Sequence, residues 1–171
     1  MKYIWWIPPI FQCLKVNVDG VALGVPVPSG CGGVFLTYRG FVKGCFYHFL
    51  RNGLAIEAEL WGMIKAVRYA SFHGRMTLWM EFDSTLAVDI LRKHSRNVPW
   101  KMISAWDECL KLVEQICLVV TYVYREENQV ADALSKRAIE EVFSLGFIVT
   151  PTLCCGLVDT DARGDVFTRL F

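Results

Sequence analysis

Apolar residues change their spacing several times along this chain, and the order of the changes restricts the fold. The first third is strand-like over residues 15–19, 31–37 and 41–49. Turn residues at 38–40 separate the last two runs, so we expect an antiparallel hairpin there. Residues 55–72 then follow a helical period. The chain therefore begins with strands that pair locally and continues with a long helix.

The rest of the chain alternates strands with helices. We predict a strand over residues 76–82 and a short helix over 84–92, with Ser84 as its N-cap. A helix over residues 100–115 and a buried β-branched strand over 117–124 follow. The final helix is predicted from an Asn128 cap to about Leu145. Residues 20–30, rich in Gly, Pro and Val, are predicted to form a loop. This order predicts an α/β domain in which helices flank a mixed sheet.

Length and composition bound the domain organisation. The 171 residues, 54% of them hydrophobic, suffice for one domain with a well-developed core. We assign residues 1–13 to a leader with the sequence Trp-Ile-Pro-Pro, residues 14–145 to the folded domain, and residues 146–171 to a tail. For the tail, disorder and a sequence unrelated to the core are both open. No apolar run reaches the roughly 18 residues of a membrane span, so we expect no transmembrane helix and no membrane contact. We also expect a monomer.

Cysteine content and net charge exclude two simple interpretations. The seven cysteines lack paired metal-ligand spacing, so a zinc site is not expected. Buried reduced thiols in an intracellular protein are the plain interpretation, with nucleus and cytoplasm both open. The net charge is only +1, so overwhelming basicity does not drive nucleic-acid binding. Residues 92–101 do gather cations without an acid, which leaves a solvated loop and a phosphate-contacting surface as alternatives.

Four acidic residues stand where the local structure disfavours a carboxylate. Asp19 and Asp83 each close a strand-like run, Glu59 lies in an apolar helix start, and Asp132 opens the last helix. If these carboxylates converge, they repel, and a divalent cation usually makes such a cluster tolerable. Each acid also has an ordinary explanation, as a turn former, a solvated residue or a first-turn charge near a helix dipole. Glu57 competes with Glu59, because both precede the apolar stripe of the helix.

Five groups of residues then occur in a recognisable order. They are residues 6–9 (WIPP) ahead of 15–20 (KVNVDG), 30–35 (GCGGVF), 57–61 (EAELW), 81–84 (EFDS) and 124–135 (YREENQVADALS). Over about residues 6–140 the chain thereby resembles the plant ribonuclease H-like domain of the type 1 ribonuclease H family, which is related to the C-terminal domain of retroelement reverse transcriptases. The resemblance implies a ribonuclease H-like fold, with a mixed five-stranded sheet and helices on both faces.

The resemblance also implies an activity, the metal-dependent hydrolysis of the RNA strand of RNA/DNA hybrids. In this family four carboxylates hold two Mg²⁺ ions, with Mn²⁺ as an alternative, and the matching positions are Asp19, Glu59, Asp83 and Asp132. The match places the helix ligand immediately before Leu60, which selects Glu59 over Glu57. Two hard cations about 4 Å apart can activate a water and stabilise the leaving oxygen of a phosphodiester. These four acids are therefore the expected catalytic and metal-binding residues.

The match is incomplete at positions that bear on catalysis. Well-characterised members carry a mobile histidine before the last helix, whereas the corresponding residues 124–128 contain none. Residues 55–56, Ala and Ile, replace the polar residues that read the minor groove of the hybrid, and the basic handle is shortened to residues 92–101. The candidates for contacts to the phosphates of the nucleic acid are Arg125, Arg92, Lys93 and Lys101.

Three functions remain open at the level of sequence. The complete carboxylate set favours an RNA/DNA hybrid endonuclease. The missing histidine and the near-neutral charge favour a non-catalytic nucleic-acid-binding or interaction module derived from a retroelement. The unpatterned tail is compatible with a degenerate fragment that has no selected activity.

Overall fold

The computed structural model of the chain describes residues 13–24 and 27–148. Among these residues a six-stranded mixed sheet has the strand order β5-β4-β1-β2-β3-β6. The strands are β1 (Leu14–Ala22), β2 (Val27–Leu36), β3 (Val42–Gly53), β4 (Thr77–Phe82), β5 (Cys117–Tyr122) and β6 (Leu145–Ile148). β1 pairs parallel with β4, which pairs parallel with β5, and the remaining neighbours are antiparallel. The hairpin of β2 and β3 is confirmed.

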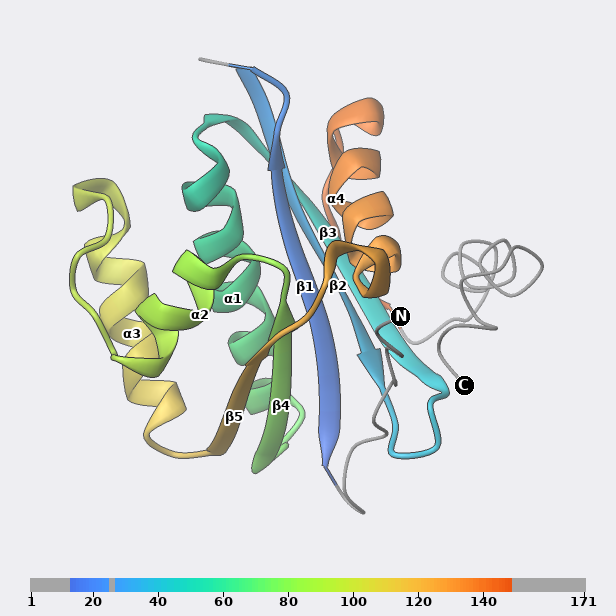
Figure 1. The fold of residues 1–171 in the computed structure, drawn as a ribbon, viewed down its shortest axis with the longest axis vertical. Coiled ribbons are helices and arrows are strands. Elements are labelled where there is room, and N and C mark those ends of the chain that lie inside the picture. Colours follow the sequence, from blue (N-terminus) through green and yellow to red (C-terminus); the bar gives the residue numbers. More distant parts are fainter. Residues whose placement is uncertain (1–12, 25–26, 149–171) are drawn as a thin grey trace, which may run out of the picture.

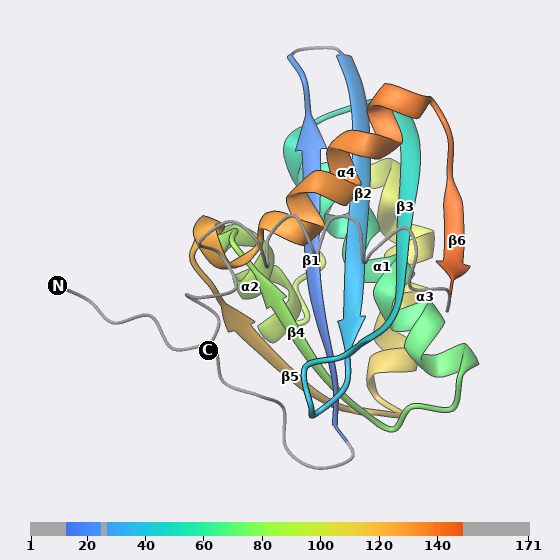
Figure 2. The ribbon, with the colours of Figure 1, turned by 90° about the vertical axis from the view of Figure 1, so that its right-hand side faces the viewer.

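Helices cover both faces of the sheet. The helices α1 (Ala55–Phe72), α2 (Thr85–Arg92) and α3 (Ile103–Val113) lie on one face, and α4 (Gln129–Glu141) lies on the other (Figure 1). Seen from the side in Figure 2, α4 crosses in front of β1, β2 and β3, the strands that it contacts. Short 3₁₀ turns at Trp100–Met102 and Arg125–Glu127 precede α3 and α4. The predicted α/β architecture with helices on both faces is therefore confirmed.

The two faces of the sheet bury cores of different size. On the face of α1, apolar side chains from three helices and from β1 and β4 form the larger core, which includes Val18, Leu60, Met63 and Trp106. On the face of α4, a small cluster contains Val34, Cys45, Tyr47, Leu134 and Ala138. Since apolar burial stabilises at about 25 cal/mol per Å², the larger core contributes most of the stability.

Two glycines allow helices to approach the sheet at the positions that concern function. A Cβ at Gly20 would lie 2.2 Å from the backbone nitrogen of Glu59, at the start of α1. A Cβ at Gly32 would lie 2.7 Å from the Cβ of Leu134, in α4. Real Cβ atoms do not make contacts this short, so both positions require the absence of a side chain. The acidic residues of β1, α1 and α4 can thus come close together.

Several structural predictions need correction. The final helix, predicted to reach about Leu145, ends at Glu141. The predicted loop over residues 20–30 is too long, because β1 extends to Ala22 and β2 begins at Val27, with Ala22 paired to Ser29. The predicted five strands become six, because Leu145–Ile148 pairs with β3 as β6. In both places pairing across the sheet overrides local turn residues.

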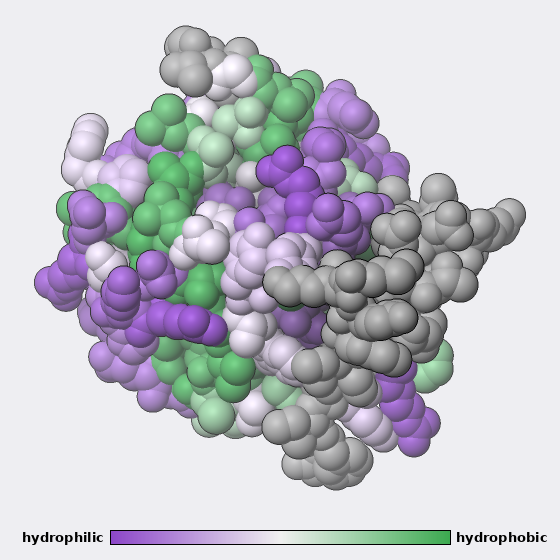
Figure 3. All heavy atoms as spheres, viewed as in Figure 1, coloured by the Kyte–Doolittle hydropathy of each residue, from purple (hydrophilic) through white to green (hydrophobic). Residues whose placement is uncertain are grey.

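The strand over residues 117–124 was predicted to be buried, and this is wrong. β5 is an edge strand of the sheet in which Val119 and Tyr122 are 46% and 43% exposed. Figure 3 shows hydrophobic surface over α2 and β5 and hydrophilic surface over α4, and the exposed apolar residues include Leu86 and Val119. An apolar β-branched run therefore predicted the strand correctly but not its place at the edge.

Several expectations fall partly outside the described residues. Most of the predicted leader (1–13) and most of the tail (146–171) lie there, so these assignments stay predictions. Within the described part, Cys13, Cys31 and Cys109 are buried free thiols and Cys117 is exposed, whereas Cys45 is disulfide-bonded and departs from the expectation of reduced thiols. Among the described helices, none combines the length and the apolar character that crossing a bilayer demands.

We predict that Gly20→Ala destabilises the protein by about 3 kcal/mol, because the new methyl group meets the backbone of α1 and overpacks the contact. Chemical denaturation measures the loss. Gly146→Ala is the matched control: among the described residues its methyl group meets the Tyr69 hydroxyl at 3.5 Å, an ordinary contact, and it should change stability by less than about 0.5 kcal/mol. Equal stabilities of the two variants would contradict the close approach of β1 to α1.

Candidate functional site

Three carboxylates meet at one end of the sheet. Asp19 lies in β1, Asp83 directly follows β4, and Glu59 lies near the start of α1, with one oxygen of each within 4.8 Å of the others. β1 and β4 are parallel and place Asn17 beside Glu81, so Asp19 and Asp83 follow at the same end of the sheet. β1 continues past Asp19 to Ala22, so Asp19 does not close its strand as predicted.

The environment of Asp19 and Glu59 disfavours their charged forms. Asp19 is 5% exposed and Glu59 8% exposed, so both are largely removed from water. Burial, together with the charges of Asp83 and Asp132, raises the pKa of Asp19 to about 7, although a hydrogen bond from Ser135 opposes the shift. Burial, followed by the charges of Asp19 and Asp83, raises the pKa of Glu59 to about 9. The cluster therefore needs protons or a cation at neutral pH.

The donor set of the cluster fits a divalent cation. Glu59 Oε2 is buried, and it has no hydrogen-bond partner in the described part of the chain. A buried carboxylate oxygen without a donor is unfavourable, and an ion at that place would account for it. Carboxylate oxygens are the ligands that Mg²⁺ and Mn²⁺ prefer. Asp19, Glu59 and Asp83 are thus the residues that could hold such an ion.

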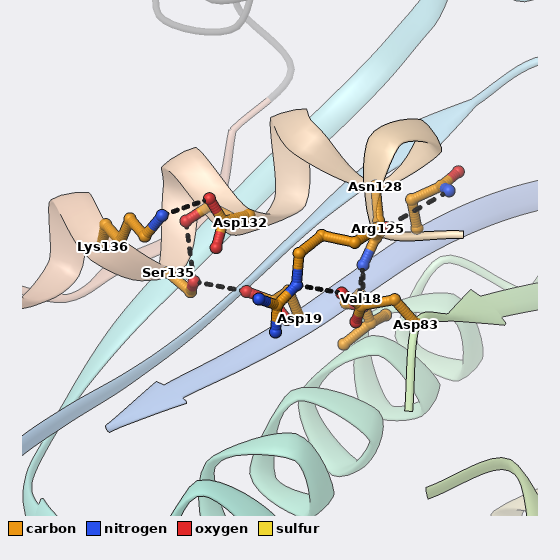
Figure 4. Close-up of polar contacts among 9 residues, drawn as sticks. Val18, Asp19, Asp83, Arg125, Asn128, Asp132, Ser135 and Lys136 are labelled. Carbon is orange, nitrogen blue, oxygen red and sulfur yellow. Dashed lines mark hydrogen bonds and ion pairs between the residues drawn. The ribbon is translucent and has the colours of Figure 1, made fainter. Parts of the chain in front are cut away.

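Asp132 lies beside this group rather than within it. Its carboxylate pairs with Lys136, one turn further along α4, at 2.6 Å. The Ser135 hydroxyl lies 2.8 Å from Asp19 Oδ2 and 2.8 Å from the backbone oxygen of Asp132 (Figure 4). Because Ser135 is fully buried, this contact ties α4 to the carboxylate of β1. A ligand role for Asp132 stays a prediction and requires its release from Lys136.

The predicted N-cap residue of α4 has a different role. Among the described residues, the Asn128 side chain caps no backbone N–H of α4. Its amide Nδ2 instead lies 2.9 Å from the Val18 backbone oxygen and 3.4 Å from Asp83 Oδ1 (Figure 4). Asn128 is 1% exposed and so joins three elements beside the cluster.

Sequence reasoning did not select Asn128 or Ser135 as residues of the site. The signal available was their spacing from Asp132, four residues before it and three after it. Such spacings place side chains on one face of a helix. Asn128, directly before α4, and Ser135, within it, therefore lie on the side of the helix that meets the carboxylates.

Of the four predicted phosphate-contacting cations, Arg125 reaches the cluster. Its Nε lies 3.4 Å from Asp83 Oδ2, and its side chain is 86% exposed, whereas that of Asp83 is 6% exposed (Figure 4). The Asp83 contact raises the pKa of Arg125. Arg125 thus connects a buried carboxylate with the solvent.

The other three cations contact groups away from the cluster. Arg92 donates through Nε and Nη2 to the Val120 backbone oxygen of β5, at 2.9 and 2.6 Å. Lys93 pairs with Asp89 at 3.5 Å, within α2. Lys101 pairs with Glu57, at the start of α1. These contacts do not bring the basic segment to the carboxylates.

Glu57 has its own partners, outside the cluster. Its Oε2 accepts a hydrogen bond from the backbone N–H of Leu54 at 3.0 Å, which caps α1. The same oxygen lies 2.8 Å from the Lys101 ammonium. The sequence left Glu57 and Glu59 as alternatives for the cluster. In the structure Glu59 lies beside Asp19 and Asp83, whereas Glu57 caps the start of α1.

The sequence profile of the family described as "Reverse transcriptase-like" matches residues 17–138. The chain belongs to this ribonuclease H-like family. A provisionally named ribonuclease H protein of Arabidopsis thaliana is 31% identical over 173 residues, which cover 98% of this chain and 27% of the relative. The chain thus spans about a quarter of that protein.

Solved structures confirm the ribonuclease H-like fold. The N-terminal ribonuclease H domain of a Mycobacterium tuberculosis protein, solved as a fusion with maltose-binding protein, matches with a TM-score of 0.69 and 22% identity, over 75% of this chain and 94% of that one. A ribonuclease H1 isolated from compost, solved in complex with an RNA/DNA hybrid, matches with a TM-score of 0.68 and 22% identity, over 75% and 98% of the two chains. At this identity the likeness concerns the fold.

We predict that Glu59→Gln stabilises the metal-free protein at pH 8. The pKa of Glu59 is raised to about 9 in the fold, so between its unfolded value and pH 9 the native state binds more protons and stability falls as pH rises. The glutamine amide carries no charge, so the variant does not lose this stability. Since one pKa unit corresponds to about 1.4 kcal/mol, we expect its free energy of unfolding at pH 8 to exceed that of wild type by about 1–3 kcal/mol. The difference should vanish near pH 4, and thermal unfolding in chelator at both pH values measures it.

Glu57→Gln is the matched control in the same helix turn. It weakens the pair with Lys101, whose side chain is 48% exposed, so a loss of less than about 1 kcal/mol is expected. A metal-free Glu59→Gln protein that is less stable than wild type at pH 8 would contradict the electrostatic account of the cluster.

Proposed function

We propose that the chain is a metal-dependent endonuclease that hydrolyses the RNA strand of RNA/DNA hybrids. The observation that carries the proposal is the convergence of Asp19, Glu59 and Asp83, with an unpartnered buried oxygen on Glu59. Membership of the family and the hybrid bound to the compost ribonuclease H1 support the substrate class. We propose Mg²⁺ as the cofactor, with two ions at the site and Mn²⁺ as a substitute.

The proposed mechanism assigns each part to a residue of the chain. Asp19, Glu59 and Asp83 would hold the ions, and Asp132 would complete the set once Lys136 has released it. Bound there, divalent cations supply the positive charge that lowers the pKa of water and stabilises a leaving alkoxide. Ser135 keeps Asp19 in place through its hydroxyl.

Arg125 is the residue that we propose for substrate contact. Its exposed guanidinium can move from Asp83 to a phosphate of the bound hybrid, where charge-assisted hydrogen bonds are strong. A hybrid differs from a DNA duplex in the 2′-hydroxyls of one strand, which a protein senses across the minor groove. Recognition would therefore rest on backbone and shape rather than on base sequence.

We predict that Asp83→Asn lowers the rate of hybrid cleavage at least about 100-fold, because it removes a charged ligand from the centre of the cluster. Cleavage of an end-labelled hybrid in Mg²⁺ or Mn²⁺ measures the rate. Asp89→Asn makes the same chemical change at an exposed residue of α2 and should keep the rate within about two-fold. A wild-type protein that cleaves in neither cation would rule out the nuclease.

A second candidate function is that of a non-catalytic nucleic-acid-binding module derived from a retroelement. Two ion pairs favour it, because Arg125 and Lys136 place cations of the chain on Asp83 and Asp132. The 3₁₀ turn before α4 (Arg125–Glu127), where family members were expected to carry a histidine, offers no such group. Tight binding of the hybrid without cleavage in either cation is the outcome that this alternative expects.

We predict that Arg125→Ala weakens hybrid binding several-fold, similarly for all sequences, and lowers the slope of log affinity against log salt by about one, as expected for a lost phosphate contact. Fluorescence anisotropy at several salt concentrations measures both quantities. Arg75→Ala is the matched control, since Arg75 is exposed between α1 and β4 at the other end of the sheet. Equal salt slopes for wild type and Arg125→Ala would contradict the contact.

A further inference from the structure

A buried ion pair lies in the sheet, away from the carboxylate cluster. Lys15 of β1 and Glu81 of β4 lie on adjacent parallel strands, two residues apart in register, with 2.9 Å between Nζ and Oε2. Their side chains are 1% and 7% exposed. The Lys15 ammonium also lies 4.7 Å from the centre of the Trp79 ring. Since desolvation offsets much of the attraction in a buried pair, stability alone is a weak reason for its presence.

Hydrogen bonds continue from this pair to the cluster. Asn17 Nδ2 lies 3.0 Å from Glu81 Oε2 and 3.4 Å from Asn128 Oδ1. Asn128 Nδ2 in turn lies 2.9 Å from the Val18 backbone oxygen and 3.4 Å from Asp83 Oδ1. The path therefore leads from the ion pair to one of the three clustered carboxylates.

The chemistry of the path fixes the orientation of each amide. Glu81 is an acceptor only, so Asn17 must present its NH₂ group to it. The second N–H of that group faces Asn128 Oδ1, which directs the NH₂ group of Asn128 toward Val18 and Asp83. A flipped Asn128 would place its oxygen against a carbonyl and a carboxylate, both acceptors. The acceptor oxygen of Glu81 thus supports, through Asn17, the orientation in which the NH₂ group of Asn128 faces Asp83.

The path is maintained at a local cost. Asn17 Oδ1 is buried and has no hydrogen-bond partner among the described residues. If Asn17 were selected for its own hydrogen bonding, a position that satisfies both of its polar atoms would be expected. Instead, the NH₂ group of Asn17 donates to both Glu81 and Asn128, and its oxygen is left without a donor in the described part of the chain.

We propose that the Lys15–Glu81 pair, acting through Asn17, orients Asn128 so that its amide holds Oδ1 of Asp83 and presents this carboxylate to a cation. This proposal rests on the proposed function, because it takes Asp83 as a ligand of the cation. Arg125 contacts the other oxygen of Asp83, Oδ2, so its departure frees one oxygen while the first stays held. Lys15, Glu81, Asn17 and Asn128 are positioning residues in this account.

The test separates positioning from stability. Lys15→Met/Glu81→Leu replaces the pair with apolar side chains, which often leaves stability unchanged or raised. We expect a folded protein whose Mn²⁺ dissociation constant, measured by titration calorimetry, is raised about 10-fold, as for the loss of an outer-shell partner of a metal site. Asn128→Ala should cause a similar loss. Lys15→Met/Glu81→Gln keeps an oxygen for Asn17 and should recover most of the affinity.

Tyr47→Phe is the matched control. It removes a partly buried contact between β3 and the last turn of α4, the Tyr47–Glu141 hydrogen bond, at the end of the helix away from the cluster. Its Mn²⁺ affinity should equal that of wild type. A folded Lys15→Met/Glu81→Leu protein with wild-type affinity would overturn the proposal, as would wild-type affinity in Asn128→Ala if the double variant does not fold.

NMR of the Asn128 side-chain amide tests the path without a metal. Its two N–H signals should shift in both double variants, most strongly in Lys15→Met/Glu81→Leu, and should stay in place in Tyr47→Phe. Signals that do not move would overturn the proposal. A wild-type protein that binds no Mn²⁺, although its amide signals respond to Glu81, would overturn the proposed function and leave the orienting path supported.

Discussion

The parallel pairing of β1 with β4 is the constraint on which the carboxylate site depends. Its register places Asn17 beside Glu81, so Asp19 and Asp83 follow at the same end of the sheet. Gly20 then admits the start of α1, and Glu59 completes the group. Side chains alternate along a strand, so a slip of one residue would turn one of the two aspartates to the opposite face. The cluster is therefore a product of strand register.

The geometry that brings the acids together also makes them unfavourable for the fold. Burial and mutual repulsion raise the pKa of Asp19 and Glu59, and the surrounding residues relieve only part of this. From the rim, Arg125 contacts Asp83 and Lys136 contacts the neighbouring Asp132, and from within the fold Ser135 contacts Asp19. Such sites are typical of functional regions, where the rest of the structure supplies the stability.

The sequence predicted most of the fold, because periodicity reports local structure directly. The helix α1 was predicted with its full range, and the Ser84 cap of α2 accepts a hydrogen bond from Ala87 as expected. The sequence does not predict features that depend on how several elements are arranged in space. The edge position of β5 depends on the absence of a further neighbour among the described strands, and the short β6 depends on pairing with β3.

The candidate site shows the same division. The three clustered acids were found from their unfavourable local settings, and the resemblance named them as a set. The orientation of Asn128 was not predictable, because its partners come from β1 and from the residue after β4, far away in sequence. The pair of Asp132 with Lys136 is a spacing of four residues that is visible in the sequence. Whether such a pair forms depends on how much the site exposes each side chain.

The contact of Arg92 with β5 affects how the molecule meets other copies of itself. An edge strand offers a row of free backbone groups with which a strand of another chain can pair, and β5 adds exposed apolar side chains to that row. The Arg92 guanidinium occupies the Val120 carbonyl with two donors and places a charge on the edge. A residue that the sequence suggested for phosphate contact thus occupies one acceptor of β5 and adds a charge there, and both features disfavour edge-to-edge pairing.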